Sequence, residues 1–309
     1  MKHNIKITTI LILMFLVTQL IGLFVISTYT QTKLPYGMEP PEEVKEKPRG
    51  LEIIVAFAIA ITLFFLLIKL NAETFIRLWY FVVTVIALSL TLNAVIFKFD
   101  IFNYGNFLAV IIALPLAYIK IFKRNIIVHN LTELLIYPGI AAVFTTLLNV
   151  PWIIILLLVI SIYDIWAVWH SQFMQKMAEF QINKLRFFTG FFVPYANKKQ
   201  RMKIKLLREK YVNKPDLLEK QFKKAKIKVN LAILGGGDVI FPIIAAGVFY
   251  KVFGIGSSLI ITVFSTLALL GLFIMARKGK FYPAMPFITA GIYLGMIVSW
   301  FVYLVLTAI

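Results

Sequence analysis

The chain has 309 residues, of which 61% are apolar and 15% aromatic, and its net charge is +18. A soluble domain could not hide so much apolar surface, so this composition excludes a soluble enzyme and indicates a polytopic membrane protein. The absence of cysteine excludes a disulfide framework and thiolate chemistry.

Nine segments are long and apolar enough to cross a bilayer as helices, because about 20 residues span about 30 Å of hydrocarbon. The first follows a basic start, but its apolar run is too long for a signal peptide, so we interpret it as a retained helix. The fifth and sixth are separated only by a short break at Pro151, which suits the first turn of a new helix. In chain order the predicted spans are 6–28, 51–70, 74–97, 103–122, 134–149, 151–170, 229–250, 256–276 and 284–307.

The spans fall into two groups around a strongly basic segment. We expect residues 1–170 to form an N-terminal six-helix part, residues 171–228 a basic loop and residues 229–309 a C-terminal three-helix part. The loop holds 16 Lys and Arg against four acidic residues. Its charge is expected to lie on an anionic membrane face rather than to bind nucleic acid.

The distribution of Lys and Arg predicts the orientation in the cell membrane. With nine spans, 26 of the 32 Lys and Arg fall on the side that holds the N-terminus and the loop 171–228. Basic residues concentrate on the cytoplasmic side of membrane proteins. We therefore expect the N-terminus and the loop to be cytosolic and the C-terminus to lie outside.

Two ionisable residues, Asp164 and Asp238, lie well inside predicted spans. Glu52, Glu133 and Asp100 lie at span boundaries instead, where water or snorkelling of the side chain can keep the charge solvated. Asp164 lies about 9 Å, and Asp238 about 13 Å, from the inner end of its span at 1.5 Å per residue. Consecutive antiparallel helices are expected to be neighbours. The two carboxylates should therefore lie within about 10 Å of each other, with direct contact not required.

Two close carboxylates cannot both ionise cheaply, so they share one proton and supply an acid and a base together. That arrangement can activate water against an amide. Spacing alone leaves open a pair that only holds two helices together, or one that lines an ion path in a transporter or ion leak channel. The three histidines, His3, His129 and His170, show no metal-binding spacing, so neither a metal nor another cofactor is expected.

Three short motifs follow one another on the sixth, seventh and ninth predicted spans: Tyr163-Asp164, the GGGD of 235–238 and the PAMP of 283–286. They resemble the Tyr-Asp, Gly-x-Gly-Asp and Pro-Ala-Leu signatures of the intramembrane aspartyl proteases, the family of presenilin and signal peptide peptidase. Met285 stands where the family has Leu, which is a volume-conserving swap. The resemblance covers essentially the whole chain, and the cysteine-free, lysine-rich composition favours a prokaryotic or archaeal homologue.

The resemblance implies an all-α fold of nine transmembrane helices and a GxGD-type aspartic endopeptidase that cleaves transmembrane or remnant signal helices in the bilayer. Asp164 and Asp238 would be the catalytic dyad. The other residues expected at the site are Tyr163, Gly235, Gly236, Gly237, Pro283, Ala284 and Met285. Tyr163 is also explained as an ordinary aromatic core residue, and Pro283 as a common helix start. The family divides by orientation, and the charge distribution here matches that of presenilin.

Two features outside these motifs carry weaker expectations. The aromatic segment 187–195 in the basic loop is interpreted as an interfacial anchor, or else as a cover over the site entrance. Gly291 and Gly295 form a GxxxG pair, which predicts close helix packing. The sequence leaves open whether partner subunits are needed.

Overall fold

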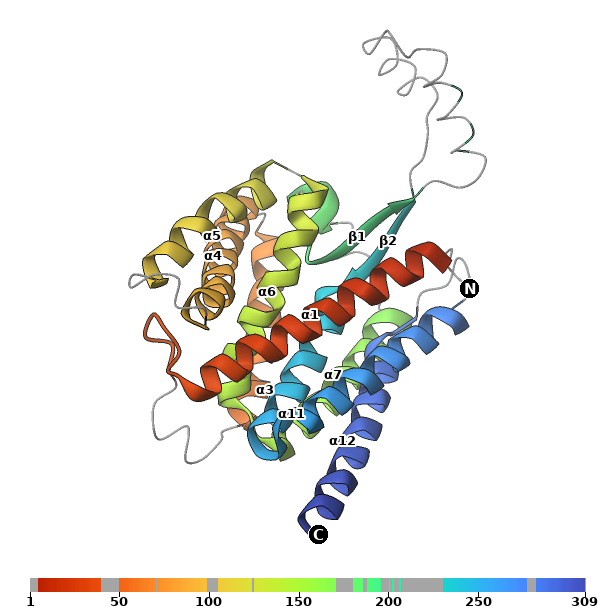
Figure 1. Cartoon of the computed structure of the whole chain (residues 1–309). Helices are drawn as coiled ribbons and strands as arrows, with labels where there is room; N and C mark the ends of the chain where they lie inside the picture. The colour runs from red at the N-terminus through yellow and green to blue at the C-terminus, as the bar shows by residue number, and fades with distance from the viewer. Residues whose placement is uncertain are drawn as a thin grey trace.

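The computed structural model is a bundle of long helices with one small sheet (Figure 1). It describes residues 5–39, 50–70, 72–98, 105–123, 125–170, 180–185, 188–195, 200, 202, 206, 230–276 and 282–308. The helices are α1 (Ile5–Gln31), α3 (Gly50–Lys69), α4 (Glu73–Lys98), α5 (Gly105–Phe122), α6 (Ile126–Leu147), α7 (Val150–Trp169), the short π-helix η1 (Gln181–Leu185), α11 (Gly236–Met275) and α12 (Met285–Ala308). The strands are β1 (Gly190–Tyr195) and β2 (Asn230–Gly235).

The helices account for the predicted number of membrane crossings. Within the described residues, seven helices are long and apolar enough to span a membrane, and α3 adds a further apolar helix of 20 residues. The 40-residue α11 is twice as long as one crossing needs, and it bends at Gly254, where φ is 80°. Glycine adopts this φ without strain, so it can join two crossings. With α3 and the two halves of α11, the described part is consistent with nine spans.

The first half of α11 is the centre of the bundle. Helices α1 and α6 both pack on it and on each other, and α1 crosses in front of both in Figure 1. The most extensive helix contact joins α11 to α12, where a Cβ atom on Gly291 would lie 2.5 Å from the Cβ atom of Ala268. A Cβ atom on Gly295 would lie 2.9 Å from the Cα atom of Ile261. Both glycines therefore allow the close packing that the GxxxG pair predicted.

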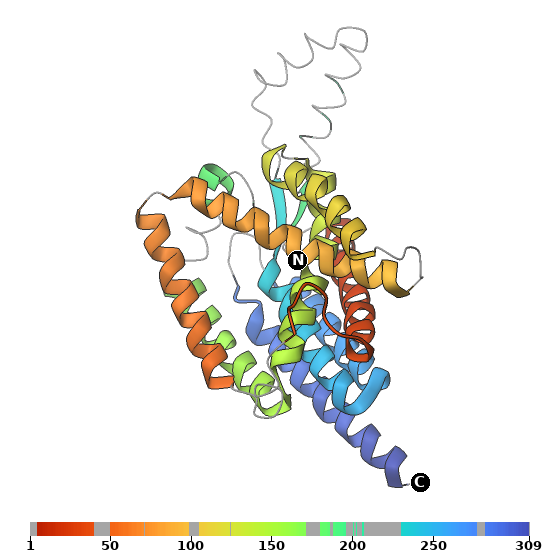
Figure 2. The same cartoon turned by 90° about the vertical axis from the view of Figure 1, so that its left-hand side faces the viewer.

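The outer faces of the bundle are apolar, as lipid requires. Helix α3 lies at one edge (Figure 2), and its Leu63 side chain is 53% exposed. The C-terminal end of α12 projects beyond the other helices, and its Phe301 is 58% exposed. In water such surfaces would drive aggregation, whereas in hydrocarbon they cost nothing.

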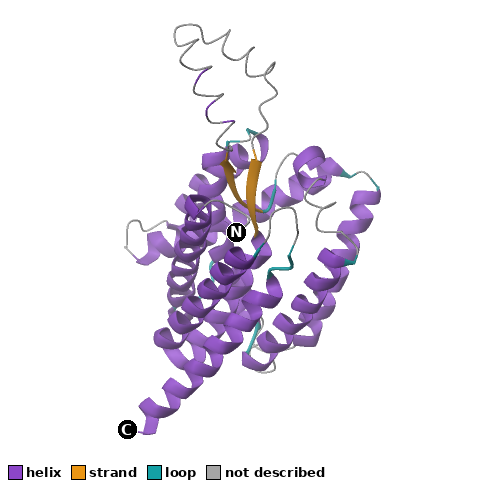
Figure 3. Ribbon diagram, turned by 90° about the vertical axis from the view of Figure 1, so that its right-hand side faces the viewer, coloured by secondary structure: helices purple, strands orange, loops and turns teal. Residues whose placement is uncertain are grey.

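The two strands form an antiparallel ribbon at one end of the bundle (Figure 3). Phe191 pairs with Leu234, and both side chains are buried in the main core. The alternate residues Leu231 and Ile233 are exposed, at 43% and 37%. This alternation of buried and exposed residues is typical of a sheet with one covered face.

The strands correct two expectations from the sequence. The seventh span was predicted over 229–250, but its helix begins only at Gly236 because residues 230–235 form β2. The segment 187–195 was interpreted as an interfacial anchor or as a cover over the site entrance. Its residues 190–195 form β1, the partner of β2, and Phe191 is buried in the core rather than at a membrane surface. Apolar strand residues resemble a membrane helix in hydropathy, and only the pairing partner distinguishes the two.

The start of α6 also differs from the prediction. Its helix begins at Ile126 rather than near 134, because the side chain of Asn125 caps it by accepting from the N–H groups of Ile127 and Val128. Glu133, predicted at a span boundary, therefore lies two turns inside the helix and is fully buried. The prediction that water would solvate it was wrong.

Candidate active site

Asp164 lies in the last part of α7 and faces the start of α12. Its side chain is only 7% exposed, and its Oδ2 atom accepts a hydrogen bond of 3.0 Å from the backbone N–H of Met285. One turn earlier, Ser161 donates a hydrogen bond of 2.8 Å to the hydroxyl of Thr289 in α12. These two contacts fix the position of the Asp164 carboxyl relative to the PAMP motif.

Asp238 is the third residue of α11 and therefore lies in the first helical turn. The N–H groups of a first turn have no partner within the helix, and the helix dipole favours a carboxylate there. The carboxyl turns back over the preceding strand end, because a Cβ atom on Gly235 would lie 3.1 Å from Asp238 Oδ2. The predicted position of Asp238, nine residues inside a helix, is thus wrong: β2 occupies the residues that were counted as helix.

The two aspartates lie on neighbouring helices, as the sequence predicted. Helices α7 and α11 are in contact, so the two carboxyls are carried by adjacent helices of the bundle. Both side chains are shielded from solvent by the surrounding helices, Asp164 more completely than Asp238. A pair in this environment can share one proton.

The three glycines before Asp238 have different surroundings. Gly235 ends β2, and Gly236 packs directly under the ring of Tyr137 in α6, where an added Cβ atom would lie 2.8 Å from the phenol oxygen. Gly237 is exposed, and an added Cβ atom there would meet only Phe241, at 3.8 Å. Close approach of two chain segments therefore requires glycine at 236, not at 237.

The remaining predicted site residues divide into two groups. Pro283 and Met285 are buried and Ala284 is half-buried, and together they border Asp164 through the N–H of Met285. Tyr163 is half-buried instead and packs on Trp166, which is on the lipid-facing side, with ring centroids 6.3 Å apart. This contact agrees with the interpretation of Tyr163 as an ordinary aromatic packing residue.

A residue of α1 contacts the site from far away in the sequence. The buried side chain of Gln19 donates a hydrogen bond of 3.0 Å to the backbone carbonyl of Val239, the residue after Asp238. Gln19 lies inside the first apolar span, and a polar residue in such a position is the signal by which sequence reasoning could have found it.

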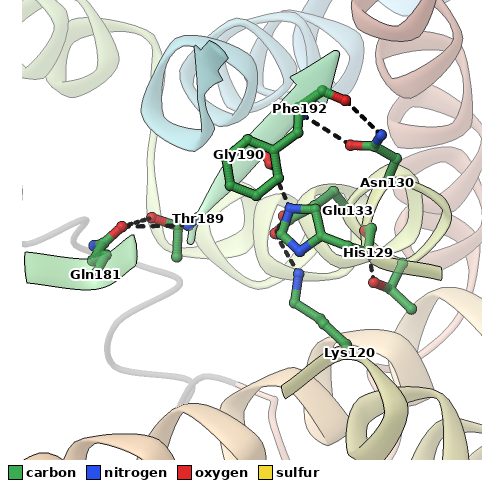
Figure 4. A network of polar contacts seen from close by, with 9 residues as sticks. Lys120, His129, Asn130, Glu133, Gln181, Thr189, Gly190 and Phe192 are labelled. Carbon is green, nitrogen blue, oxygen red and sulfur yellow. Dashed lines mark hydrogen bonds and ion pairs between the residues drawn. The ribbon is translucent and has the colours of Figure 1, made fainter. Parts of the chain in front are cut away.

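A buried polar network lies beside the strands (Figure 4). Lys120 of α5 donates to Glu133 of α6, and neither side chain is exposed. The Nε2 atom of His129 lies 3.7 Å from Glu133 and 2.8 Å from the carbonyl oxygen of Gly190 in β1. In the count of Lys and Arg that predicted the orientation, Lys120 was included with the loop that follows the fourth span. This was wrong, because Lys120 lies in α5 and Glu133 neutralises it inside the bundle.

Among the described residues, no three acidic or histidine side chains gather where they could hold a metal ion.

Comparisons with known proteins place the chain in a family. A family model described as signal-peptide peptidase, presenilin aspartyl protease matches residues 12–305. Two solved structures of a presenilin family intramembrane aspartate protease, in different crystal forms, share the fold at 17% sequence identity. For the first, the TM-score is 0.61 and the match covers 96% of this chain and 99% of that chain. For the second, the TM-score is 0.58 and the coverage is 94% and 96%.

In a comparison by sequence with curated proteins, none matches the chain. The solved structures show the likeness of the fold, and the family model covers nearly every residue of the bundle and all three motifs. The chain therefore belongs to the family of signal-peptide peptidase and presenilin aspartyl proteases and is an intramembrane aspartyl protease.

Proposed function

We propose that Asp164 and Asp238 are the catalytic dyad and that they hydrolyse peptide bonds of transmembrane or remnant signal helices. The observation that carries this proposal is the pair itself: two carboxyls, both largely shielded from solvent, on the neighbouring helices α7 and α11. In the singly protonated pair, the carboxylate takes a proton from water as the water attacks the amide carbon. The protonated partner supplies a proton to the peptide, whose C–N bond then breaks.

The backbone N–H of Met285 has a positioning role in this proposal. It holds the Oδ2 atom of Asp164 at 3.0 Å and so fixes the carboxyl beside the start of α12. A hydrogen bond to a carboxylate is stronger than one between neutral groups, so it ties the start of α12 to the site. Because the contact comes from the backbone, Met and Leu can both serve at position 285.

The outer edge of β2 supports an extended mode of substrate binding. In an antiparallel pair, two residues that do not bond to each other point their N–H and C=O groups to opposite edges of the ribbon. The carbonyl groups of Gly190 and Phe192 point to α6. The N–H and C=O groups of their partners, Gly235 and Ile233, therefore point to the opposite edge. No other described residue bonds to those groups of Ile233. An unpaired strand edge can accept an extended peptide by main-chain hydrogen bonds. A substrate strand along β2 would run toward Asp238, which follows Gly235 by three residues.

The chemistry of hydrolysis also requires that the substrate bind in an extended form. The amides of an intact helix are hydrogen-bonded and packed, so water cannot attack them until that segment opens. Pairing with β2 would replace the lost helical hydrogen bonds.

The orientation and the wider organisation are part of the same proposal. The Lys and Arg distribution supports a cytosolic N-terminus and loop 171–228, with the C-terminus outside. We also keep the proposed division of the chain into an N-terminal part (1–170), a basic loop (171–228) and a C-terminal part (229–309). The partners are the lipid bilayer and transmembrane substrates, and no nucleic acid or cofactor is expected.

Binding of a substrate-like peptide with a hydroxyl isostere at the cleaved bond tests the dyad. Transition-state analogues bind at least about 100-fold more tightly than substrates. The wild type should show a gain of this size over the same peptide without the hydroxyl, and Asp164→Asn and Asp238→Asn should each lose most of it. An asparagine side chain at position 164 can still accept from the N–H of Met285, so thermal unfolding should show a folded variant. Equal affinity for both peptides in the wild type would refute the proposed chemistry.

A further inference from the structure

The outer edge of β1 is occupied by a side chain of α6 rather than by another strand. Asn130 donates a hydrogen bond of 2.7 Å from Nδ2 to the carbonyl oxygen of Phe192, and its Oδ1 accepts one of 2.9 Å from the N–H of the same residue (Figure 4). A residue of a neighbouring strand would make the same two bonds. Asn130 thus satisfies the edge of β1 as a third strand would.

His129 bonds to the same edge of β1 at Gly190, two residues before Phe192. A carbonyl oxygen only accepts, so the Nε2 atom of His129 carries the hydrogen that bonds to Gly190 at 2.8 Å. The imidazole ring also stacks on Phe192, with ring centroids 4.8 Å apart. We call His129 and Asn130 together the α6 clamp.

The buried ion pair supports the α6 clamp. Glu133, one turn after His129, places its carboxylate 3.7 Å from Nε2 and favours a hydrogen on that atom. Lys120 neutralises Glu133 inside the bundle. A buried ion pair is weak evidence for stability, because apolar residues in its place are often neutral or stabilising. Its presence among apolar helices therefore points to a role in holding a defined geometry.

The α6 clamp occupies the outer edge of β1 and leaves the outer edge of β2 available. Through the pairs Gly190 to Gly235 and Phe192 to Ile233, the position of β1 sets that of β2. The N–H of Gly236 then donates to the carbonyl of Thr189 at 3.2 Å, which ties the first residue of α11 to the segment before β1. Asp238 follows two residues later.

We infer that the α6 clamp consists of positioning residues that select β2 as the strand that receives substrate and set which peptide bond reaches the aspartates. This inference rests on the proposed function, in which the substrate pairs with β2. Shifting a strand by one residue turns its side chains to the opposite face. A substrate that pairs with β2 in a register shifted by one residue would therefore place a different peptide bond beside the aspartates.

The test compares Asn130→Ala with Leu131→Ala, a matched truncation of the next residue, whose side chain is 50% exposed on the outer face of α6. Purified variants in lipid vesicles are given a single-span peptide, and mass spectrometry identifies every cut position. KM and kcat are measured alongside. Asn130→Ala should cut at additional positions and raise KM about tenfold, as loss of two hydrogen bonds allows. Leu131→Ala should match the wild type.

A third variant separates alignment from general stability. Asn130→Asp keeps an acceptor for the N–H of Phe192 but, when ionised, cannot donate to its carbonyl. Its cut pattern should lie between those of the wild type and Asn130→Ala. If all three cut at the wild-type position with unchanged KM, and rates fall only with the folded fraction, the α6 clamp has no alignment role. If the wild type itself does not cut, the proposed function fails instead.

Discussion

Replacement of Gly236 by alanine tests the close packing of the GGGD motif on α6. The added Cβ atom would lie 2.8 Å from the phenol oxygen of Tyr137 and 3.0 and 3.2 Å from two of its ring carbons. The ring cannot retreat easily, because it is 3% exposed and packs edge-on against Phe191 at 5.7 Å. Overpacking of this kind costs about 1–3 kcal/mol. The first turn of α11, which carries Asp238, is therefore expected to move.

Gly237→Ala is the matched control, because it adds the same methyl group one residue later in the same turn. There the new Cβ atom would make only an ordinary contact of 3.8 Å with Phe241. Both variants gain at most about 1 kcal/mol in helix propensity. Gly236→Ala should therefore be about 1–3 kcal/mol less stable than Gly237→Ala.

Thermal unfolding of the two purified variants in one detergent measures this difference. At roughly 2 °C per kcal/mol, Gly236→Ala should unfold about 2–6 °C below Gly237→Ala. Equal unfolding temperatures, or a more stable Gly236→Ala, would refute the packing of Tyr137 on Gly236.

Three further predictions concern the buried ion pair, the dyad and the loop. Lys120→Met should destabilise the protein by about 3–5 kcal/mol, since it leaves the buried Glu133 carboxylate without its lysine partner. A second change of Glu133 to Gln should recover most of this loss in thermal unfolding, and additive losses would contradict the pair. Cleavage rate against pH should be bell-shaped, because activity needs one proton on the pair Asp164 and Asp238; a rate that rises steadily with pH would exclude proton sharing. Protease added to intact cells should leave the loop 171–228 uncut and should cut it in inside-out vesicles, and the reverse pattern would invert the proposed orientation.

The helices and the two aspartates could be predicted from the sequence because the bilayer imposes simple rules. A span needs a long apolar run, and a carboxylate within one is expensive enough to be noticed. Asp164 and Asp238 were therefore visible without any knowledge of packing. Their presence on consecutive antiparallel spans also predicted that α7 and α11 would be neighbours, which the structure confirms.

The strands and the buried network could not be predicted in the same way. The residues of β2 continue the apolar run of the seventh span, so hydropathy alone assigns them to its helix. Their partner β1 pairs across 34 intervening residues, and such long-range pairing leaves no local pattern. Likewise, Lys120 and Glu133 each resemble a charge near a span end, and only the packing of α5 against α6 brings them together.

The most direct test of the central claim is the reaction of the purified protein alone with a single-span peptide in lipid vesicles. Mass spectrometry should find two fragments that end inside the apolar span and whose masses sum to that of the peptide plus one water. Neither Asp164→Asn nor Asp238→Asn should produce these fragments, although both should remain folded. An intact peptide with the wild type, or the same fragments with either variant, would contradict a two-aspartate intramembrane protease.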